Sequence, residues 1–103
     1  MNNVDIILPT YNCAEYIEEA INSVIGQTLE NWKLIIIDDA SKDTTTSLIK
    51  NYLNDKRIFL KILKKNKGQG FCRNLALRYS NSKYVAFIDS DDIWKKDKLI
   101  TPK

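Results

Sequence analysis

Four short runs of apolar residues recur along the chain, and each is followed by polar or turn-forming residues. The runs span residues 4–8, 33–37, 58–63 and 84–88. Apolar runs of this length predict buried strands, and Pro9 is expected to end the first one abruptly. The chain therefore offers four strands for one sheet.

Between these runs, apolar residues recur every three or four positions, which predicts amphipathic helices. We expect Asn12 to cap the first helix with Glu15 as its capping-box partner, and Gly26 to end it. Further helices are predicted over residues 45–53 and 71–79. The apolar faces of the first two helices are Ile17, Ala20, Ile21, Val24 and Ile25, and then Leu48, Ile49, Tyr52 and Leu53.

The alternation of strands and helices predicts the fold class. Near-continuous apolar strands separated by helices are typical of a mostly parallel sheet that is covered on both faces, with right-handed crossovers. The expected fold is therefore a three-layer α/β/α arrangement. With 103 residues, the chain has room for one domain, 1–103.

Composition narrows the chemistry. The chain has no histidine, which excludes Ser-His-Asp and Cys-His catalysis and imidazole metal sites. Cys13 and Cys72 supply only two thiolates, whereas a structural zinc site needs four ligands. Because residues 1–5 show no secretory signal, we expect a reduced pair of cysteines and a cytoplasmic protein.

Two further classes of partner are not expected. The longest aliphatic run, residues 34–37, is far shorter than a membrane span, so the chain is predicted to have no membrane segment. The net charge is +3 and the lysine cluster at residues 64–67 is isolated, so we expect no nucleic-acid binding.

Acidic residues follow two of the predicted strands directly. Residues 38–43 contain Asp38, Asp39 and Asp43, and residues 89–92 contain Asp89, Asp91 and Asp92. Ligands of parallel sheets bind beyond the carboxyl ends of the strands, so these acids are expected to meet at one edge. A bound cation would relieve their repulsion, and hard oxygen ligands select Mg²⁺ or Mn²⁺.

Structural interpretations compete with this one. Residues 38–43 fit equally well a solvated loop in which Asp43 caps the next helix. Three acids in four positions after an apolar strand favour a metal role for residues 89–92. Gly68 and Gly70 lack the spacing of a dinucleotide or Walker motif, so they indicate a phosphate loop only weakly.

Four segments, taken in order, carry a family resemblance. They read Pro-Thr-Tyr-Asn at 9–12, Ile-Asp-Asp-Ala-Ser-Lys-Asp at 37–43, Asn-Lys-Gly-Gln-Gly-Phe-Cys-Arg-Asn at 66–74 and Ile-Asp-Ser-Asp-Asp at 88–92. Together they resemble the successive signatures of family 2 glycosyltransferases with the GT-A fold. The resemblance runs from about Val4 to Trp94. Two residues depart from it, since Ala40 stands where glycine is usual and Cys72 where alanine is usual.

The resemblance implies that the chain is a nucleotide-sugar-binding domain with strand order 3-2-1-4. In such a domain Pro9, Thr10 and Tyr11 would bind the nucleotide, with Thr10 and Tyr11 holding the base and Tyr11 stacking on it. Asp39 would accept a hydrogen bond from a uracil-like ring nitrogen. The implied donor is therefore a UDP-sugar.

The same resemblance implies the residues for the diphosphate and the metal. Gly68 and Arg73 would approach the nucleotide or its phosphates. Asp89 and Asp91 match the D-x-D element of the family, in which Asp91 would contact the Mn²⁺ or Mg²⁺ ion directly and Asp89 would face the ribose or the metal. Asp92 would lie nearby.

The implied activity is transfer of a sugar from a nucleotide-diphosphate sugar to a hydroxyl of a glycan or lipid-linked acceptor, as in bacterial surface polysaccharide synthesis. A full-length protein would then work at the inner face of the membrane. In the family the acceptor base comes from a segment well beyond the D-x-D element, and this chain ends eleven residues after Asp92. We therefore expect a truncated, donor-binding part with no catalytic residue of its own, inactive in transfer by itself.

Alternative functions remain open at this level. A phosphotransferase of the haloacid dehalogenase type would use Asp89 as a nucleophile, although its motif normally opens the chain. A nucleotidyltransferase would show a glycine-rich basic loop after the first strand, where this chain has residues 9–12. A nucleotide- or metal-binding module without catalysis is the third alternative.

The predicted sheet also has an exposed edge. In the order 3-2-1-4, the strand at residues 84–88 lies at the end of the sheet, and its interior carries no charge or proline to oppose pairing. Only Lys83 guards its start. We therefore expect a homodimer through this edge strand.

Overall fold

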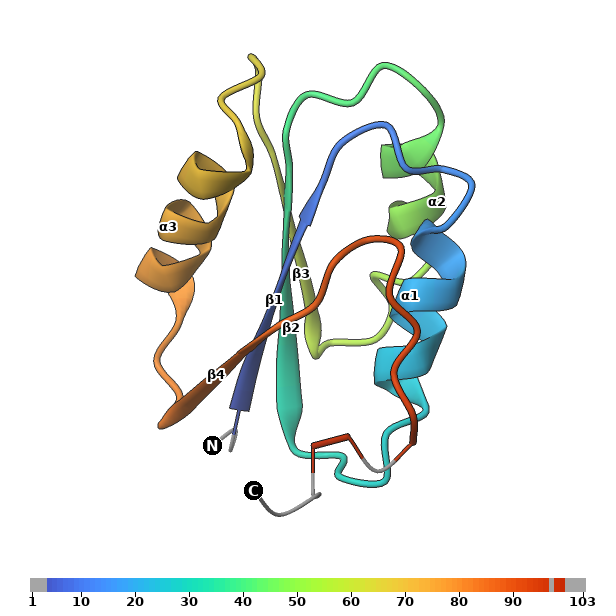
Figure 1. Ribbon diagram of the computed structural model, residues 1–103, viewed down its shortest axis with the longest axis vertical. Coiled ribbons are helices and arrows are strands. Elements are labelled where there is room, and N and C mark those ends of the chain that lie inside the picture. The colour runs from blue at the N-terminus through green and yellow to red at the C-terminus, as the bar shows by residue number, and fades with distance from the viewer. Residues whose placement is uncertain (1–3, 97, 100–103) are drawn as a thin grey trace.

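The computed structural model describes residues 4–96 and 98–99, which form three layers (Figure 1). The elements are β1 (Val4–Thr10), α1 (Ile17–Ile25), β2 (Trp32–Asp38), α2 (Thr45–Lys50), β3 (Ile58–Ile62), α3 (Gln69–Tyr79) and β4 (Tyr84–Phe87). Helix α3 covers one face of the sheet, whereas α1 and α2 cover the other (Figure 1). The predicted α/β/α class is therefore confirmed.

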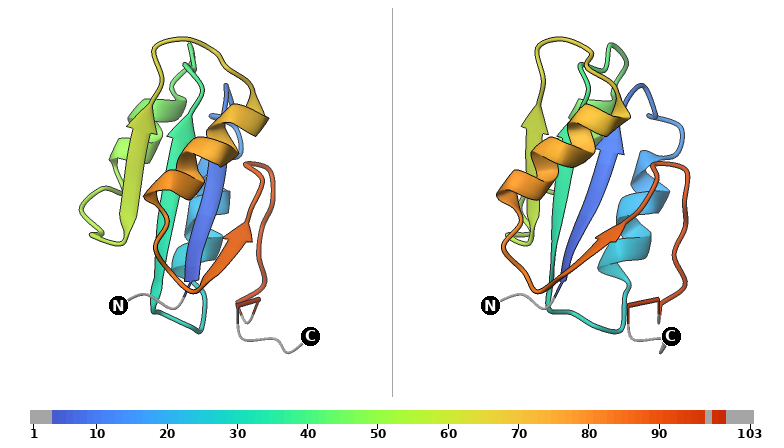
Figure 2. Two further views of the ribbon diagram at one scale, coloured as in Figure 1. Left: turned by 90° about the vertical axis from the view of Figure 1, so that its left-hand side faces the viewer. Right: turned by 60° about the vertical axis from the view of Figure 1, so that its left-hand side comes forward.

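The four strands are parallel and lie in the order β3-β2-β1-β4, as predicted (Figure 2). Strands β2 and β3 thus lie on one side of β1, and β4 lies on the other side of β1. The order of strands switches between β1 and β4, and in open sheets of this kind ligands bind at such a switch point.

Strand β1 does not end at Pro9, which corrects the sequence prediction. The strand continues to Thr10, and Pro9 pairs in register with Ile37 of β2. Backbone groups alternate sides along a strand, and Ile7 directs its carbonyl oxygen toward the β4 side, where it accepts from the Ile88 amide at 3.0 Å. Pro9, two residues later, therefore also faces the β4 side. The β1–β4 ladder ends at Ile7, so no hydrogen bond of this ladder requires the N–H that proline lacks.

The expected capping box at the start of α1 is also wrong. Helix α1 begins at Ile17, and Tyr16 at its N-cap makes no side-chain capping bond. Asn12 has a positive φ of 47°, and its amide oxygen instead accepts hydrogen bonds from the backbone amides of Lys42 (2.8 Å) and Asp43 (3.4 Å). Asn12 thus joins the loops after β1 and β2, while Gly26 ends α1 as predicted.

The remaining elements differ from their predicted bounds by a few residues. Helix α2 stops at Lys50, three residues earlier than expected, and Leu53 beyond it is exposed. Helix α3 begins two residues earlier, at Gln69. None of the helices formed by the described residues combines the length and the hydrophobicity needed to cross a bilayer.

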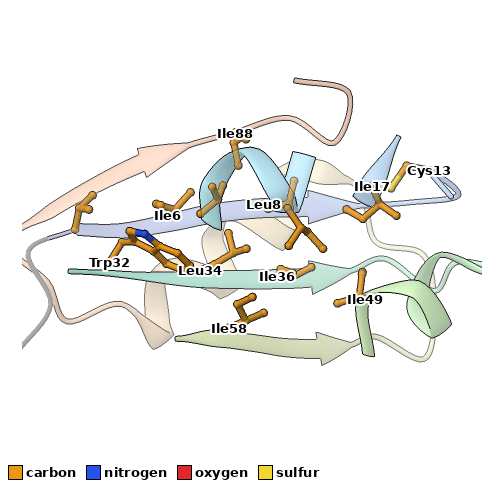
Figure 3. Packing of buried hydrophobic residues seen from close by; sticks show 13 residues of the cluster. Ile6, Leu8, Cys13, Ile17, Trp32, Leu34, Ile36, Ile49, Ile58 and Ile88 are labelled. Carbon is orange, nitrogen blue, oxygen red and sulfur yellow. The ribbon is translucent and has the colours of Figure 1, made fainter. Parts of the chain in front are cut away.

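The sheet separates two hydrophobic clusters. The larger cluster packs β-strand residues such as Ile6 and Leu34 against Ile17 and Ile21 of α1 (Figure 3). The smaller one lies on the α3 side and contains Ile7, Ile35, Ile37, Cys72 and Ala76. Because Cys13 belongs to the first cluster and Cys72 to the second, the two thiols lie on opposite faces of the sheet and both are free.

Candidate functional site

A pocket of about 440 Å³ opens at the carboxyl edge of β1 and β4, at the switch point of the sheet. Its lining residues come from the loop after β1, the start of α3 and the turn after β4. They are Tyr11, Asn12, Cys13, Tyr16, Gln69, Arg73, Asp89, Ser90 and Asp91. The fold therefore brings together Tyr11, Arg73, Asp89 and Asp91 of the predicted site residues, whereas Pro9, Thr10, Asp39 and Gly68 do not line this pocket.

The acidic turn after β4 presents two carboxylates to the pocket. The Asp92 amide donates to the Asp89 carbonyl at 2.9 Å, and the Asp89 amide donates to Oδ2 of Asp92 at 3.3 Å. Asp92 is thus bonded back onto the turn itself. Asp89 and Asp91 remain on the pocket wall.

Arg73 reaches the acidic turn from α3. Its Nη2 lies 3.3 Å from Oδ1 of Asp89, and the two side chains are 39% and 57% exposed. An exposed pair of this kind contributes little to stability, so the pairing costs little to break. Arg73 can therefore turn toward an anion in the pocket, and its planar guanidinium suits phosphate oxygens.

Asp39 follows β2, and its carboxylate already accepts two hydrogen bonds. Its side chain is buried, Oδ1 accepts from the Lys67 amide at 2.6 Å and Oδ2 accepts from the Gly68 amide at 2.9 Å. These bonds hold the loop before α3, in which Gly68 adopts a φ of 93° at the N-cap. A carboxylate has about four acceptor positions, so the two bonds leave about two positions for further donors.

Thr10 and Asp38 form a buried hydrogen bond between the ends of β1 and β2. The Thr10 hydroxyl donates to Oδ1 of Asp38 at 2.7 Å, and both residues are buried. Ser41 completes the group, since its hydroxyl and its amide donate to the two oxygens of Asp38 at 2.6 and 2.8 Å. The sequence indicated Asp38 as an edge acid, but its carboxylate points into the protein and not into the pocket.

Asp43 also serves the loops. Its carboxylate accepts from the Thr45 amide at 2.9 Å and from the Ala14 amide at 3.3 Å. The hydrogen bond that the Thr45 hydroxyl donates lowers the pKa of Asp43, and it outweighs the smaller, opposing effect of burial. This agrees with the capping interpretation of Asp43 that the sequence left open.

Several pocket residues had no role in the sequence analysis. Tyr16 is 47% exposed, and the neighbouring Glu15 carboxylate raises the pKa of its phenol, with a smaller contribution from Asp91. Gln69 and Ser90 add an amide and a hydroxyl. Tyr16 could have been found from its place just before the apolar stripe of α1, where an aromatic residue faces away from the core.

Neither cysteine has the chemistry of a nucleophile. Cys13 lines the pocket, but burial raises the pKa of its thiol. Burial, followed by the Asp39 charge, raises the pKa of Cys72 to about 11. Both thiols are therefore neutral near pH 7 and poorly reactive.

The donor set of the pocket fits a hard divalent cation. Asp89 and Asp91 offer carboxylate oxygens, which suit Mg²⁺ or Mn²⁺. Within residues 4–96 and 98–99, no three His, Cys, Asp or Glu side chains cluster as a complete metal site. Mg²⁺ usually binds through one or two carboxylates together with substrate phosphates, so two carboxylates beside an arginine match that mode.

A doubly wound parallel sheet with a D-x-D turn at its switch point defines the GT-A class of glycosyltransferases. The family profile "Glycosyl transferase family 2" matches residues 5–101, and the chain belongs to this family. Because the chain belongs to this family, the alternative of a haloacid dehalogenase-type enzyme with Asp89 as its nucleophile is wrong.

Known proteins similar to the chain are longer. TuaG of Bacillus subtilis strain 168, a glycosyltransferase named for teichuronic acid biosynthesis, is 45% identical over 97 residues, which are 93% of this chain and 38% of TuaG. Two solved structures are also similar. TarS 1–349 of S. aureus in complex with UDP has a TM-score of 0.90 at 34% identity and covers 97% of this chain, which spans 30% of that protein.

The mannosyltransferase PcManGT of Pyrobaculum calidifontis, in complex with GDP-Man and Mn²⁺, has a TM-score of 0.79 at 28% identity, over 89% of this chain and 28% of that one. The chain thus spans less than two fifths of the length of each of these proteins.

Proposed function

We propose that this chain binds the nucleotide-sugar donor of a glycosyl transfer, with a UDP-sugar as the donor. The observation that carries the proposal is the pocket in which Tyr11, Arg73, Asp89 and Asp91 meet at the switch point of a family 2 sheet. The complex of similar TarS with UDP supports the choice of a uridine nucleotide.

Each residue has a role in this proposal. Tyr11, which is 46% exposed, stacks on the base, and Asp39 accepts a hydrogen bond from it with its remaining lone pairs. Arg73 leaves Asp89 for the diphosphate. Asp91 is the direct ligand of Mn²⁺ or Mg²⁺, and Asp89 binds the ribose or the metal. Pro9 and Thr10 at the end of β1, and Gly68 at the N-cap of α3, determine the backbone path of the loops that carry the binding residues.

Asp91 and Asp89 would hold a divalent cation here, which would supply positive charge against the negative charge on the nucleoside diphosphate as it leaves the sugar. PcManGT, which is similar in fold, was solved with Mn²⁺. Arg73 adds a second positive charge at the same phosphates. We propose that the acceptor is a hydroxyl of a glycan or of a lipid-linked saccharide, and that the full-length protein works at the inner face of the membrane. The name of TuaG, which refers to biosynthesis of the polysaccharide teichuronic acid, supports a glycan acceptor.

Thermal unfolding with nucleotide and metal tests the proposal. We expect UDP with Mn²⁺ to raise the Tm of the chain by mass action, UDP with a chelator to raise it little, and Asp91→Asn to remove the metal-dependent part. GDP in place of UDP tests the base, and Asp39→Asn should reduce the preference for UDP.

Asp92→Asn is the matched control, because Asp92 is bonded back onto the turn. Equal binding of UDP with and without the metal in calorimetry contradicts the metal assignment. Equal binding of UDP and GDP contradicts the assignment of the base.

A further inference from the structure

Gln27, which follows α1, holds its side-chain amide in the interior. The residue is only 3% exposed, although an amide is costly to bury unless its groups are hydrogen bonded. Its Nε2 donates to the carbonyl oxygens of Lys95 at 2.6 Å and Ser23 at 3.2 Å, and its Oε1 accepts from the Leu99 amide at 3.0 Å. Two of its three partners are thus about 70 positions away in the sequence.

The next residue makes a contact of the same kind. The Thr28 amide donates to the Lys96 carbonyl at 2.6 Å. All the partners on this distant segment are backbone groups, so the contacts of Gln27 and Thr28 determine the path of the chain and do not depend on its side chains. We call these contacts the Gln27 clasp.

The clasp closes on the chain directly after the acidic turn. Before the turn, Ile88 is buried and its amide donates to the Ile7 carbonyl at 3.0 Å. After the turn, Trp94 and Leu99 pack against the larger hydrophobic cluster, and the segment runs back along α1 (Figure 1). Residues 89–93 therefore span the gap between two anchors, one on β1 and one at the clasp.

The turn has few contacts of its own. Among the described residues its bonds are those between Asp89 and Asp92, a hydrogen bond between Ser90 and the Cys13 thiol, and the exposed pair of Asp89 with Arg73, while Ile93 is 65% exposed. A short segment with so few contacts takes its position from its two ends. If the clasp opens, the end at Lys95 is released and Asp91 loses its place on the pocket wall.

We propose that Gln27 is a positioning residue for the acidic turn: by clasping the backbone at Lys95 and Leu99, it holds Asp91 where a divalent cation and a diphosphate bind. The inference rests on the proposed function for the identity of those ligands. Gln27 lines no part of the pocket, so it acts through the path of the chain.

The first test compares Gln27→Met with the wild-type chain by calorimetry of UDP, with Mn²⁺ and with a chelator. Methionine keeps the length of the side chain and removes every hydrogen bond of the amide. Because loss of a residue that orients a metal ligand typically weakens metal-dependent binding about 10- to 100-fold, we expect a loss of that size with Mn²⁺ and little change with chelator. Ser23→Ala is the matched control, because it removes a side-chain hydrogen bond from the same helix, to the Ala20 carbonyl, while keeping the backbone carbonyl of Ser23 that Gln27 contacts.

Amide hydrogen exchange supplies a readout that does not depend on any ligand. Gln27→Met should lose protection at Asp92 and Leu99 while β1 and β2 keep theirs. A residue that merely supports overall stability would raise exchange across the whole sheet. Unchanged UDP affinity in Mn²⁺ together with unchanged protection at Asp92 and Leu99 overturns the inference.

A second variant covers the case in which Gln27→Met does not fold. Gln27→Glu keeps the shape of the side chain but places an unprotonated oxygen against the Lys95 carbonyl at neutral pH. Protection at the Thr28 amide, which donates to the neighbouring Lys96 carbonyl, should be lost at neutral pH and return when the introduced carboxyl is protonated and can donate; unchanged protection of Thr28 at neutral pH overturns the inference. If wild-type binding of UDP is independent of Mn²⁺, the metal part of the proposed function fails, and the exchange results still decide the role of Gln27.

Discussion

Ala40 has a backbone conformation that favours glycine. Its φ is 63°, in the left-handed region that glycine adopts most readily. A side chain with a Cβ costs about 1 kcal/mol or more in this region. The departure noted in the sequence is therefore a local strain in the loop that joins Asp39 to Ser41.

We expect Ala40→Gly to raise the free energy of unfolding by about 0.5–1 kcal/mol, because relief of strain exceeds the added freedom of the unfolded chain. This corresponds to a rise of roughly 4 °C in Tm, measurable by calorimetry. Ala14→Gly is the control, since Ala14 is not among the described residues with positive φ, and it should lower Tm. A lower Tm for Ala40→Gly than for the wild-type chain would contradict the claim that the backbone of Ala40 is strained.

In the proposed function, Asp39 serves both the structure and the ligand. It ties down the Lys67 and Gly68 amides and has lone pairs left for a base. Its substitution therefore acts on the loop as well as on the nucleotide. For this reason the ratio of UDP to GDP affinity, and not the UDP affinity alone, measures its contact with the base.

At the scale of the elements, the turn between α3 and β4 depends on one buried carboxylate. Asp5 of β1 is buried, and it accepts hydrogen bonds from the hydroxyls of Ser80 and Ser82 at 2.7 Å each and from the amides of Asn81 and Ser82. Burial raises the pKa of Asp5, but these hydrogen bonds outweigh it and hold the pKa below its ordinary value. The carboxylate thus fixes the entry into β4 at the end of the sheet opposite the pocket.

The lowered pKa of Asp5 has a definite consequence for stability. A carboxylate with a depressed pKa in the folded state stabilises the fold above its unfolded pKa of about 4, and the stabilisation is lost as the pH falls through the folded value. We expect Asp5→Asn to lower the free energy of unfolding at pH 7 by about 2 kcal/mol. The difference from wild type should shrink below about pH 4 in urea unfolding, whereas exposed Glu18→Gln should show little effect at any pH. A difference that is constant with pH would contradict the role of the Asp5 charge.

At the scale of the whole molecule, β4 is one of the two edge strands of the described sheet, with β3 at the other end. It pairs with β1 on one side, and Tyr84 and Phe87 are 61% and 52% exposed. A groove of about 850 Å³ lies between β4 and Trp94, Lys98 and Leu99, and it is lined largely by apolar side chains. An unpaired apolar edge of this kind favours pairing with another strand.

We therefore expect reversible association of two copies through β4. Light scattering or sedimentation over a wide concentration range should show an average mass that rises with concentration. Phe87→Lys should abolish the rise by placing a charge at the edge, while Phe71→Lys on the exposed face of α3 should not. A wild-type chain that stays monomeric throughout contradicts this expectation.

The sequence by itself determined the elements, their order and the edge of the sheet that carries the site. Apolar periodicity reports which positions are buried, and the rules for parallel sheets convert that pattern into layers and a switch point. These rules predicted that Asp89 and Asp91 lie at that edge, and the family resemblance added Tyr11 and Arg73; all four lie around one pocket. The bounds were less certain, as at Pro9 and Asn12, because they depend on neighbouring strands and loops.

Only the tertiary structure decided which polar groups are used internally. The hydrogen bonds of Thr10 with Asp38, of Asp39 with the Lys67 amide and of Gln27 with Leu99 join residues 28 to 72 positions apart. No local pattern encodes such partners, because a buried polar side chain is satisfied by whatever groups the folded chain brings within about 3 Å. The chemistry of the site thus follows from the sequence, while the positions of its carboxylates follow from contacts that exist only in the fold.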